Sequence, residues 1–182
     1  MDNDSRHRAP TGWLRPGPEI HRAVARTWAE SVVVVTGRSV AGQPLGFTVS
    51  SFTSVSLDPP LVLFCVGHRS RSWAGMAPTG RFAINLLGAD QSEVADRFAG
   101  RGDPSGDLDR EQFADGSPLL PDASGTVVCR LLTVHPAGDH DIVIGRIEHA
   151  RLIRRVPPLV YHQADYTTVT SPVPHRGALD AS

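Results

Sequence analysis

The side chains best suited to bind a polar ligand lie between residues 48 and 57, where hydroxyl-bearing and apolar residues alternate. The hydroxyl groups belong to Thr48, Ser50, Ser51, Thr53, Ser54 and Ser56, and the apolar side chains to Val49, Phe52, Val55 and Leu57. A period of two predicts an extended segment with one buried face and one face of small hydrogen-bonding groups. Such a face can bind a polar ligand without adding charge. The same pattern also suits an ordinary half-exposed strand, so this stretch alone leaves both interpretations open.

A second group of candidates runs from His68 to Ser72, between an apolar run and a short helical pattern. We expect Ser70 to cap a helix over residues 71–77, which Pro78 and Gly80 end. Helix amides, a serine hydroxyl and the guanidinium of Arg71 together favour an anion site of phosphate size. A solvated helix cap with two exposed arginines is the alternative.

The turn Gly138-Asp139-His140 is the third candidate, because it lies between two predicted strands. A Gly-Asp turn is ordinary, and a histidine beside it is normally a surface residue. His140 has a functional role only if this turn overhangs a binding site. Cys65 and Cys129 both lie inside apolar runs, so we expect buried free thiols rather than a disulfide.

Composition excludes several other classes of site. The 182 residues are 40% hydrophobic and 20% charged with a formal net charge of −1, which is typical of one globular domain without a field that attracts nucleic acid. The chain contains no lysine, so a lysine Schiff base and a Walker-type phosphate site are absent. The sequence has no GxGxxG, HExxH, CxxC or GxSxG pattern, and we expect no metal site.

The elements that must position these residues are mostly strands. A helix is predicted from Pro18, with Ile20, Val24 and Trp28 on one face. A capping-box spacing from Asp90 to Glu93 predicts a second helix that ends near Gly100, and a helical turn is expected around residues 108–113. Strands are predicted at residues 32–36, 61–66, 82–87, 126–134 and 141–153.

Because these strands do not alternate strictly with helices, the pattern favours a mainly β fold with inserted helices, arranged as an antiparallel barrel. We expect one domain over residues 18–170, between a flexible N-terminal arm at residues 1–17 and a flexible C-terminal tail at residues 171–182. No apolar run reaches the roughly 20 residues of a membrane span, and we expect a cytoplasmic protein without a membrane partner.

Several of these motifs, taken in order, resemble the short-chain flavin reductase family, whose members serve two-component monooxygenases. The matching segments are GFTVSSFTSVSLDPPLVLFCV at 46–66, SRSW at 70–73, RFAINLL at 81–87, QSEVADRFAG at 91–100, GDHDIVIG at 138–145 and PLVYH at 158–162. The resemblance implies an FMN-binding split β-barrel that forms a homodimer. The chain differs from many members at Glu30-Ser31 and in lacking a glycine pair after Tyr161-His162.

The resemblance also assigns roles to individual residues. It implies that the flavin ring and ribityl chain lie along Thr48, Val49, Ser50, Ser51 and Ser54, with Cys65 nearby. The phosphate would be held by Ser70, Arg71 and Ser72. Phe98, Ala99 and Gly100 would cover the flavin ring, and Tyr166 would be a further aromatic contact. His140, next to Asp139, would be the catalytic residue beside the nicotinamide.

The function implied is an NADH- or NADPH-dependent flavin reductase that supplies reduced FMN, or FAD, to a separate oxygenase. Hydride would pass from the nicotinamide to the flavin, so the protein's task would be to hold the two rings together. Two alternatives stay open. One is a flavoenzyme that retains its flavin and acts on an organic substrate, and the other is a flavin-binding or electron-transfer module without catalytic activity.

Overall fold

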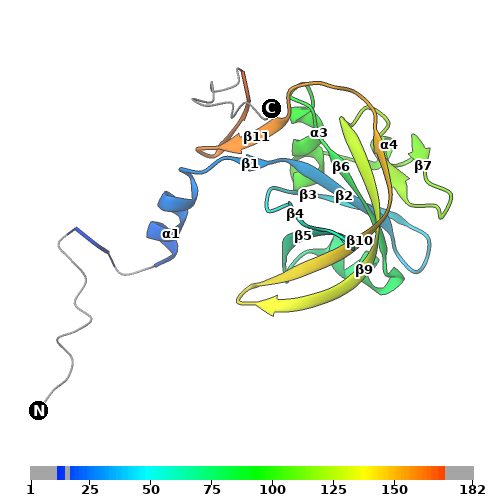
Figure 1. Ribbon diagram of the computed structural model, residues 1–182, viewed down its shortest axis with the longest axis horizontal. Coiled ribbons are helices and arrows are strands. Elements are labelled where there is room, and N and C mark those ends of the chain that lie inside the picture. The colour runs from blue at the N-terminus through cyan, green and yellow to red at the C-terminus, as the bar shows by residue number, and fades with distance from the viewer. Residues whose placement is uncertain (1–11, 15–16, 171–182) are drawn as a thin grey trace, which may run out of the picture.

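The β-branched run near residue 33 forms the most buried strand of a curved antiparallel sheet (Figure 1). The computed structural model describes residues 12–14 and 17–170. Within them, the seven strands of this sheet lie in the order β3-β2-β6-β9-β10-β5-β4. Their bounds are β2 Val33–Arg38, β3 Pro44–Val49, β4 Thr53–Leu57, β5 Pro60–Gly67, β6 Arg81–Leu86, β9 Gly125–Ala137 and β10 His140–Leu152.

β9 and β10 form a long hairpin that extends beyond the rest of the barrel (Figure 1). Their pairing shifts in register between Ile144 and Gly145 and again between Ile147 and His149. Such irregularities bend a strand and increase its twist, which allows one sheet to close on itself. The mainly β class and the barrel predicted from the sequence are therefore confirmed.

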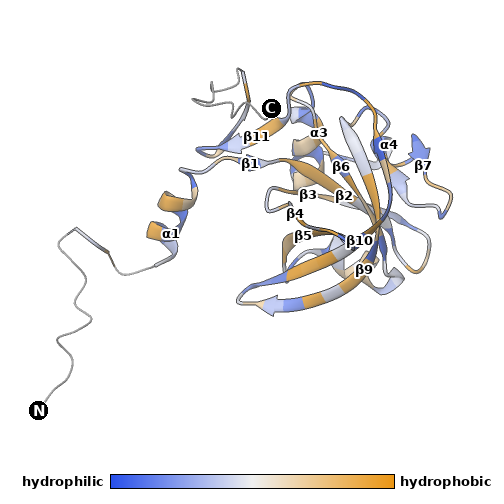
Figure 2. Ribbon diagram, viewed as in Figure 1, coloured by the Kyte–Doolittle hydropathy of each residue, from blue (hydrophilic) through white to orange (hydrophobic). Residues whose placement is uncertain are grey.

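The interior of the sheet is filled by aromatic and aliphatic side chains. Phe64 packs edge-to-face on both Phe82 and Trp73, with ring centroids 5.6 Å apart in each pair. A second apolar cluster lies on the other side of β2 and includes Val34, Leu87 and Phe98. Apolar residues are accordingly prominent on the central strands in Figure 2.

Short elements complete the fold around the sheet. β1 (Glu30–Ser31), β11 (Leu159–His162) and β12 (Asp165–Thr168) form a three-stranded sheet, and β7 (Glu111–Gln112) pairs with β8 (Pro118–Leu119). The helical elements are α1 Pro18–Ala25, α2 Arg71–Met76, a 3₁₀ turn Ala77–Thr79, α3 Ser92–Asp96, a π-helical turn Arg97–Arg101 and α4 Ser105–Leu108. No helix in the described part of the chain is long and apolar enough to cross a membrane.

The predicted N-terminal helix is confirmed, but it is shorter than the pattern indicated. α1 ends at Ala25, so Trp28 lies beyond it, and none of its residues is buried. Figure 1 shows α1 apart from the barrel, beside β1 and β11. The tail predicted at residues 171–182, and most of the arm predicted at residues 1–17, lie outside the described residues.

Two local predictions are wrong. The capping box at Asp90 does not form, because α3 begins at Ser92 without a side-chain cap and the Asp90 carboxylate binds Arg154 at 2.7 and 2.9 Å. The helical turn expected at residues 108–113 lies earlier, at Ser105–Leu108, and is followed by β7.

The hydroxyl-rich stretch is two strands rather than one extended segment. β3 ends at Val49 and pairs with β2, whereas β4 begins at Thr53 and pairs with β5. Residues 50–52 cross from one edge of the sheet to the other. The expected buried face is also missing from β4, because Val55 and Leu57 are 46% and 90% exposed.

Candidate functional site

A cavity of about 430 Å³ opens where the chain crosses from β3 to β4. β5, the start of β10 and the π-helical turn complete its walls. The lining residues are Phe47, Thr48, Val49, Ser50, Ser51, Cys65, Val66, Gly67, Ser70, Phe98, Ala99 and His140. Its size falls within the roughly 300–1,000 Å³ that is usual for sites of cofactors and other small molecules.

The crossing segment is tied to β5 by the hydroxyl group of Ser51. Ser51 Oγ accepts a hydrogen bond from Cys65 N at 2.9 Å and donates one to the Cys65 carbonyl at 3.1 Å. These two hydrogen bonds hold the segment in place, where it has no backbone hydrogen bonds to a neighbouring strand of the described chain. Among the described residues, none accepts a hydrogen bond from the amides of Ser50, Ser51 or Phe52. These amides therefore remain available to a ligand.

A buried phenyl ring closes another side of the cavity. Phe98 is 5% exposed and lies so close to Gly46 that a Cβ added there would be 2.5 Å from Phe98 Cε1. The hydroxyl of Thr48 donates to the Ala95 carbonyl at 2.6 Å, which fixes α3 against β3. Gly100, with φ of 84°, then turns the chain away at the end of this wall.

His140 reaches the cavity because of the register between β10 and β5. It pairs directly with Gly67, and the imidazole lies over that residue, because a Cβ added there would be 3.6 Å from His140 Nε2, an ordinary contact. His140 Nδ1 lies 2.7 Å from Asp139 Oδ1, and the hydrogen bond from His140 holds the pKa of the Asp139 carboxyl below its usual range. The side chain of Asp139 is 95% exposed, so it orients the ring from solvent.

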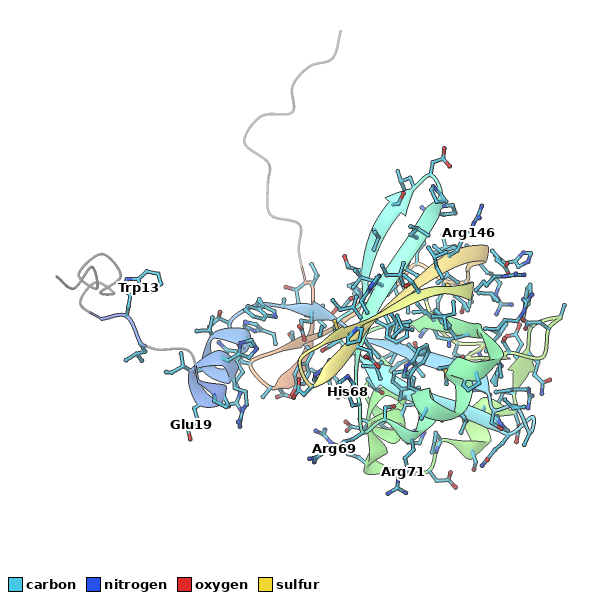
Figure 3. All side chains as sticks on the ribbon, turned by 90° about the horizontal axis from the view of Figure 1, so that it is seen from below. Trp13, Glu19, His68, Arg69, Arg71 and Arg146 are labelled. Atoms are coloured by element: carbon cyan, nitrogen blue, oxygen red, sulfur yellow. The ribbon has the colours of Figure 1, made fainter. Side chains whose placement is uncertain are left out.

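Ser70 lines the cavity at the start of α2, and its amide donates a hydrogen bond to the Gly67 carbonyl at 2.9 Å. As predicted, it caps that helix, because its Oγ accepts a hydrogen bond from Trp73 N at 3.2 Å. Arg71 follows it and is exposed. Figure 3 shows Arg69 and Arg71 extending outward at the edge of the molecule, on a different side from Arg146.

The structure brings together nine of the residues proposed from the sequence: Thr48, Val49, Ser50, Ser51, Cys65, Ser70, Phe98, Ala99 and His140. Ser54, Arg71, Ser72, Gly100, Asp139 and Tyr166 do not line this cavity. Phe47, Val66 and Gly67 line it but were not proposed. The sequence could have indicated them, because Phe47 precedes Thr48 and Val66 and Gly67 follow Cys65 in the same strands.

Tyr166 lies in a neighbouring cavity of about 180 Å³, which shares Thr48, Ser50 and Ala99 with the first. Its hydroxyl donates a hydrogen bond to Asp96 Oδ1 at 3.2 Å. Burial and the nearby Asp96 carboxylate raise the pKa of the Tyr166 phenol, so it is a neutral donor at physiological pH.

Both cysteines are free, as predicted. Cys65 is partly exposed at the cavity, so its predicted full burial is wrong. Cys129 is inaccessible on β9, and burial raises the pKa of its thiol to about 12.

Residues 25–170 match the family model described as a flavin reductase like domain. The chain is 36% identical over 169 residues to the reductase subunit HsaB of a flavin-dependent monooxygenase from Rhodococcus jostii, covering 90% of this chain and 86% of that one. It is 38% identical over 168 residues to an NADH:riboflavin 5'-phosphate oxidoreductase from Streptomyces pristinaespiralis, with 87% and 92% covered.

The structure also resembles that of nitrilotriacetate monooxygenase component B from Mycobacterium thermoresistibile. The TM-score is 0.79 at 33% identity, over 90% of this chain and 95% of the other. The family match spans the barrel strands and every residue that lines the cavity. The chain belongs to the flavin reductase-like family.

Proposed function

We propose that this protein is an NADH-dependent flavin reductase that supplies reduced flavin to a separate flavin-dependent oxygenase. The observation that carries the proposal is the cavity of about 430 Å³, in which free backbone amides, serine hydroxyls, a phenyl ring and a histidine meet. The names of the Rhodococcus and Streptomyces relatives support the same reaction and the same kind of partner.

The residues present fit a flavin mononucleotide. The amides of Ser50, Ser51 and Phe52 have no acceptor among the described residues, and the carbonyl and nitrogen acceptors on the edge of an isoalloxazine ring match such donors. Phe98 and Val66 provide apolar surface for the ring. No acidic side chain lines the cavity to repel a phosphate.

When bound, the flavin supplies the chemistry, because its N5 accepts the hydride that leaves C4 of the nicotinamide. The chain's own residues hold and orient the two reactants. Ser50 and Ser51, which line the cavity, bind the polar edge of the flavin through neutral groups, which suits a flavin that is released after each turnover. His140, oriented by Asp139, lies at the mouth of the cavity and positions the nicotinamide.

The phosphate is assigned to the start of α2. Ser70 lines the cavity, and the amides of Arg71 and Ser72 belong to the first turn of that helix, where they lack an intrahelical acceptor. Arg71 adds a flexible cation next to these donors. Ser54, which lies on exposed β4, is no longer assigned to the flavin.

The active species is a homodimer. β4 is an edge strand, and Val55 and Leu57 on it are 46% and 90% exposed. An exposed apolar edge strand favours association with another chain. Because β4 continues directly from the crossing segment, a second subunit on β4 would also cover the open side of the cavity.

Oxidation of NADH, followed at 340 nm with and without added FMN, tests the function. We expect the flavin-free protein to be inactive alone and its rate to saturate with FMN. Turnover that needs an organic substrate but no added flavin would instead favour a retained flavin. Flavin binding without NADH oxidation would favour an electron-transfer module. Replacement of NADH by NADPH, and of FMN by FAD, then defines the preferred substrates.

A further inference from the structure

The cavity that contains Tyr166 has no role in the reaction described above. It has a volume of about 180 Å³ and adjoins the flavin cavity along Thr48, Ser50 and Ala99. Its remaining lining residues are Val32, Arg101, Tyr161 and Tyr166. Arg101 is the only ionised side chain in this lining, so the cavity presents one positive charge beside two aromatic rings.

Arg101 is held at this position and still has free donors. Its Nη1 donates to Asp96 Oδ1 at 2.8 Å, and the same oxygen accepts the hydrogen bond from the Tyr166 hydroxyl. Asp96 does not line the cavity, so it orients the Arg101 and Tyr166 side chains from outside the lining. The side chain of Arg101 is 66% exposed, and a guanidinium carries five N–H donors. The remaining N–H groups of the guanidinium can bind an anionic group in bidentate geometry.

The two tyrosines form an aromatic wall next to this cation. Tyr161 and Tyr166 are opposite each other in the β11–β12 hairpin, with ring centroids 5.8 Å apart and an angle of 64° between the rings. Tyr161 also lines a further cavity of about 270 Å³, together with Arg22, Arg26 and Trp28. An elongated ligand that leaves the flavin cavity can therefore contact Arg101, then the aromatic surface, and then a cavity whose charged lining residues include Arg22, Arg26 and Glu30.

We infer that this second cavity binds the adenosine diphosphate half of a dinucleotide. The diphosphate pairs with Arg101, and the adenine packs against the tyrosine wall and extends past Tyr161. This inference rests on the proposed function, because NADH and FAD each carry an adenosine diphosphate half joined to their reactive ring. A ring held in the flavin cavity places that half in the adjoining space.

ADP-ribose is the appropriate probe, because it contains this half and lacks both a nicotinamide and a flavin ring. Calorimetry with the FMN-saturated protein should show binding, and Arg101→Ala should weaken it about tenfold or more, the scale of one lost charge-assisted contact. Arg101→Lys should restore part of the affinity. Arg110→Ala removes another exposed, ion-paired arginine and should change nothing. Tyr166→Leu should weaken binding, whereas Tyr166→Phe should retain most of it.

Further measurements identify which dinucleotide uses the cavity. If it is NADH, Arg101→Ala raises the KM for NADH while kcat and the Kd for FMN stay unchanged. If it is FAD, the variant weakens FAD but not FMN and leaves the KM for NADH unchanged. Failure of the wild-type protein to bind ADP-ribose, or equal binding by wild type and Arg101→Ala, would overturn the inference. Loss of the proposed function has a different signature, which is the absence of NADH oxidation at saturating FMN.

Discussion

At the scale of single residues, the flavin site depends on small polar groups whose positions are set by the backbone. The hydroxyl of Ser51 bonds within the protein, because it both accepts from and donates to the backbone of Cys65. The hydroxyl of Thr48 likewise donates its hydrogen bond within the protein, to the Ala95 carbonyl. In the proposed site, the ligand would therefore be recognised mainly by the free amides of the crossing segment, which Ser51 ties to β5, rather than by the row of hydroxyls itself.

Arg71→Ala should weaken FMN about tenfold or more, because one charge-assisted hydrogen bond contributes about 1.5–3 kcal/mol. Fluorescence titration of the flavin measures this change. Riboflavin lacks the phosphate and should bind wild type and variant equally well. Arg146→Ala, which removes an exposed arginine on another side of the molecule, serves as the matched control. An unchanged Kd for FMN in Arg71→Ala would remove Arg71 from the site.

His140→Ala should lower kcat/KM for NADH about 10- to 100-fold, the scale of one positioning contact of about 1.4–2.7 kcal/mol. The Kd for FMN should change little, because the proposed flavin contacts are backbone amides and Ser70 rather than the imidazole. His135→Ala removes an exposed histidine from the same hairpin and should leave the kinetics unchanged. Loss of FMN affinity with normal hydride transfer at saturating flavin would reassign His140 to the flavin.

The two thiols should react very differently with iodoacetamide. Cys65 lies at the cavity, whereas Cys129 is 0% exposed and its pKa of about 12 keeps the thiol protonated. Only the thiolate is nucleophilic, so one equivalent of label should enter at pH 8, at Cys65. Bound FMN should slow that labelling. Peptide mass analysis gives the site, and label at Cys129 in the folded protein would contradict this assignment.

At the scale of elements, the strands were predictable because each contains a short apolar run rich in β-branched or aromatic residues, and the run at 61–66 is also bounded by Pro60 and Gly67. The runs at residues 32–36, 61–66, 82–87, 126–134 and 141–153 all contain strands. Their pairing was not predictable. His140 enters the cavity only because β10 is aligned so that it faces Gly67, and that register depends on contacts between residues far apart in sequence.

The errors in local structure share a cause, which is tertiary contact overriding local preference. Asp90 has the spacing of a helix cap, yet it binds Arg154, which lies 64 residues later in the chain. The pattern around residues 48–57 predicted one extended segment, yet Ser51 binds across to Cys65 and divides the stretch. No nearby sequence signal identifies either partner.

The contact between β3 and the π-helical turn should be sensitive to a single methyl group. Gly46→Ala would place Cβ 2.5 Å from Phe98 Cε1 and 3.3 Å from the Val35 carbonyl oxygen, so the phenyl ring must move. We expect a loss of about 1–3 kcal/mol in the free energy of unfolding together with weaker FMN binding. Gly106→Ala, where no atom lies within 4 Å of the added Cβ, is the control and should be tolerated. Denaturant unfolding and flavin titration measure the two effects. Unchanged FMN affinity would show that Phe98 does not contribute to flavin binding.

At the scale of the whole molecule, several apolar side chains of the described residues are largely exposed. Val55 and Leu57 are exposed on β4, and Val24 and Trp28 are 54% and 47% exposed on or just after α1. α1 itself lies apart from the barrel (Figure 1), and Figure 2 shows apolar residues along it. Helices of this length are rarely stable in water without packing, so a second chain would account for both exposed regions.

Leu57→Asp should therefore convert a dimer into a monomer, because a carboxylate buried without a partner in an apolar interface costs several kcal/mol. Sedimentation equilibrium or light scattering at micromolar protein measures the mass. Val40→Asp changes another highly exposed apolar residue, 79% exposed in the turn between β2 and β3, and should leave the dimer intact. Because β4 continues from the segment that supplies the flavin-binding amides, the monomeric variant should also bind FMN more weakly. A wild-type monomer that binds FMN tightly would contradict the dimer and its role in the site.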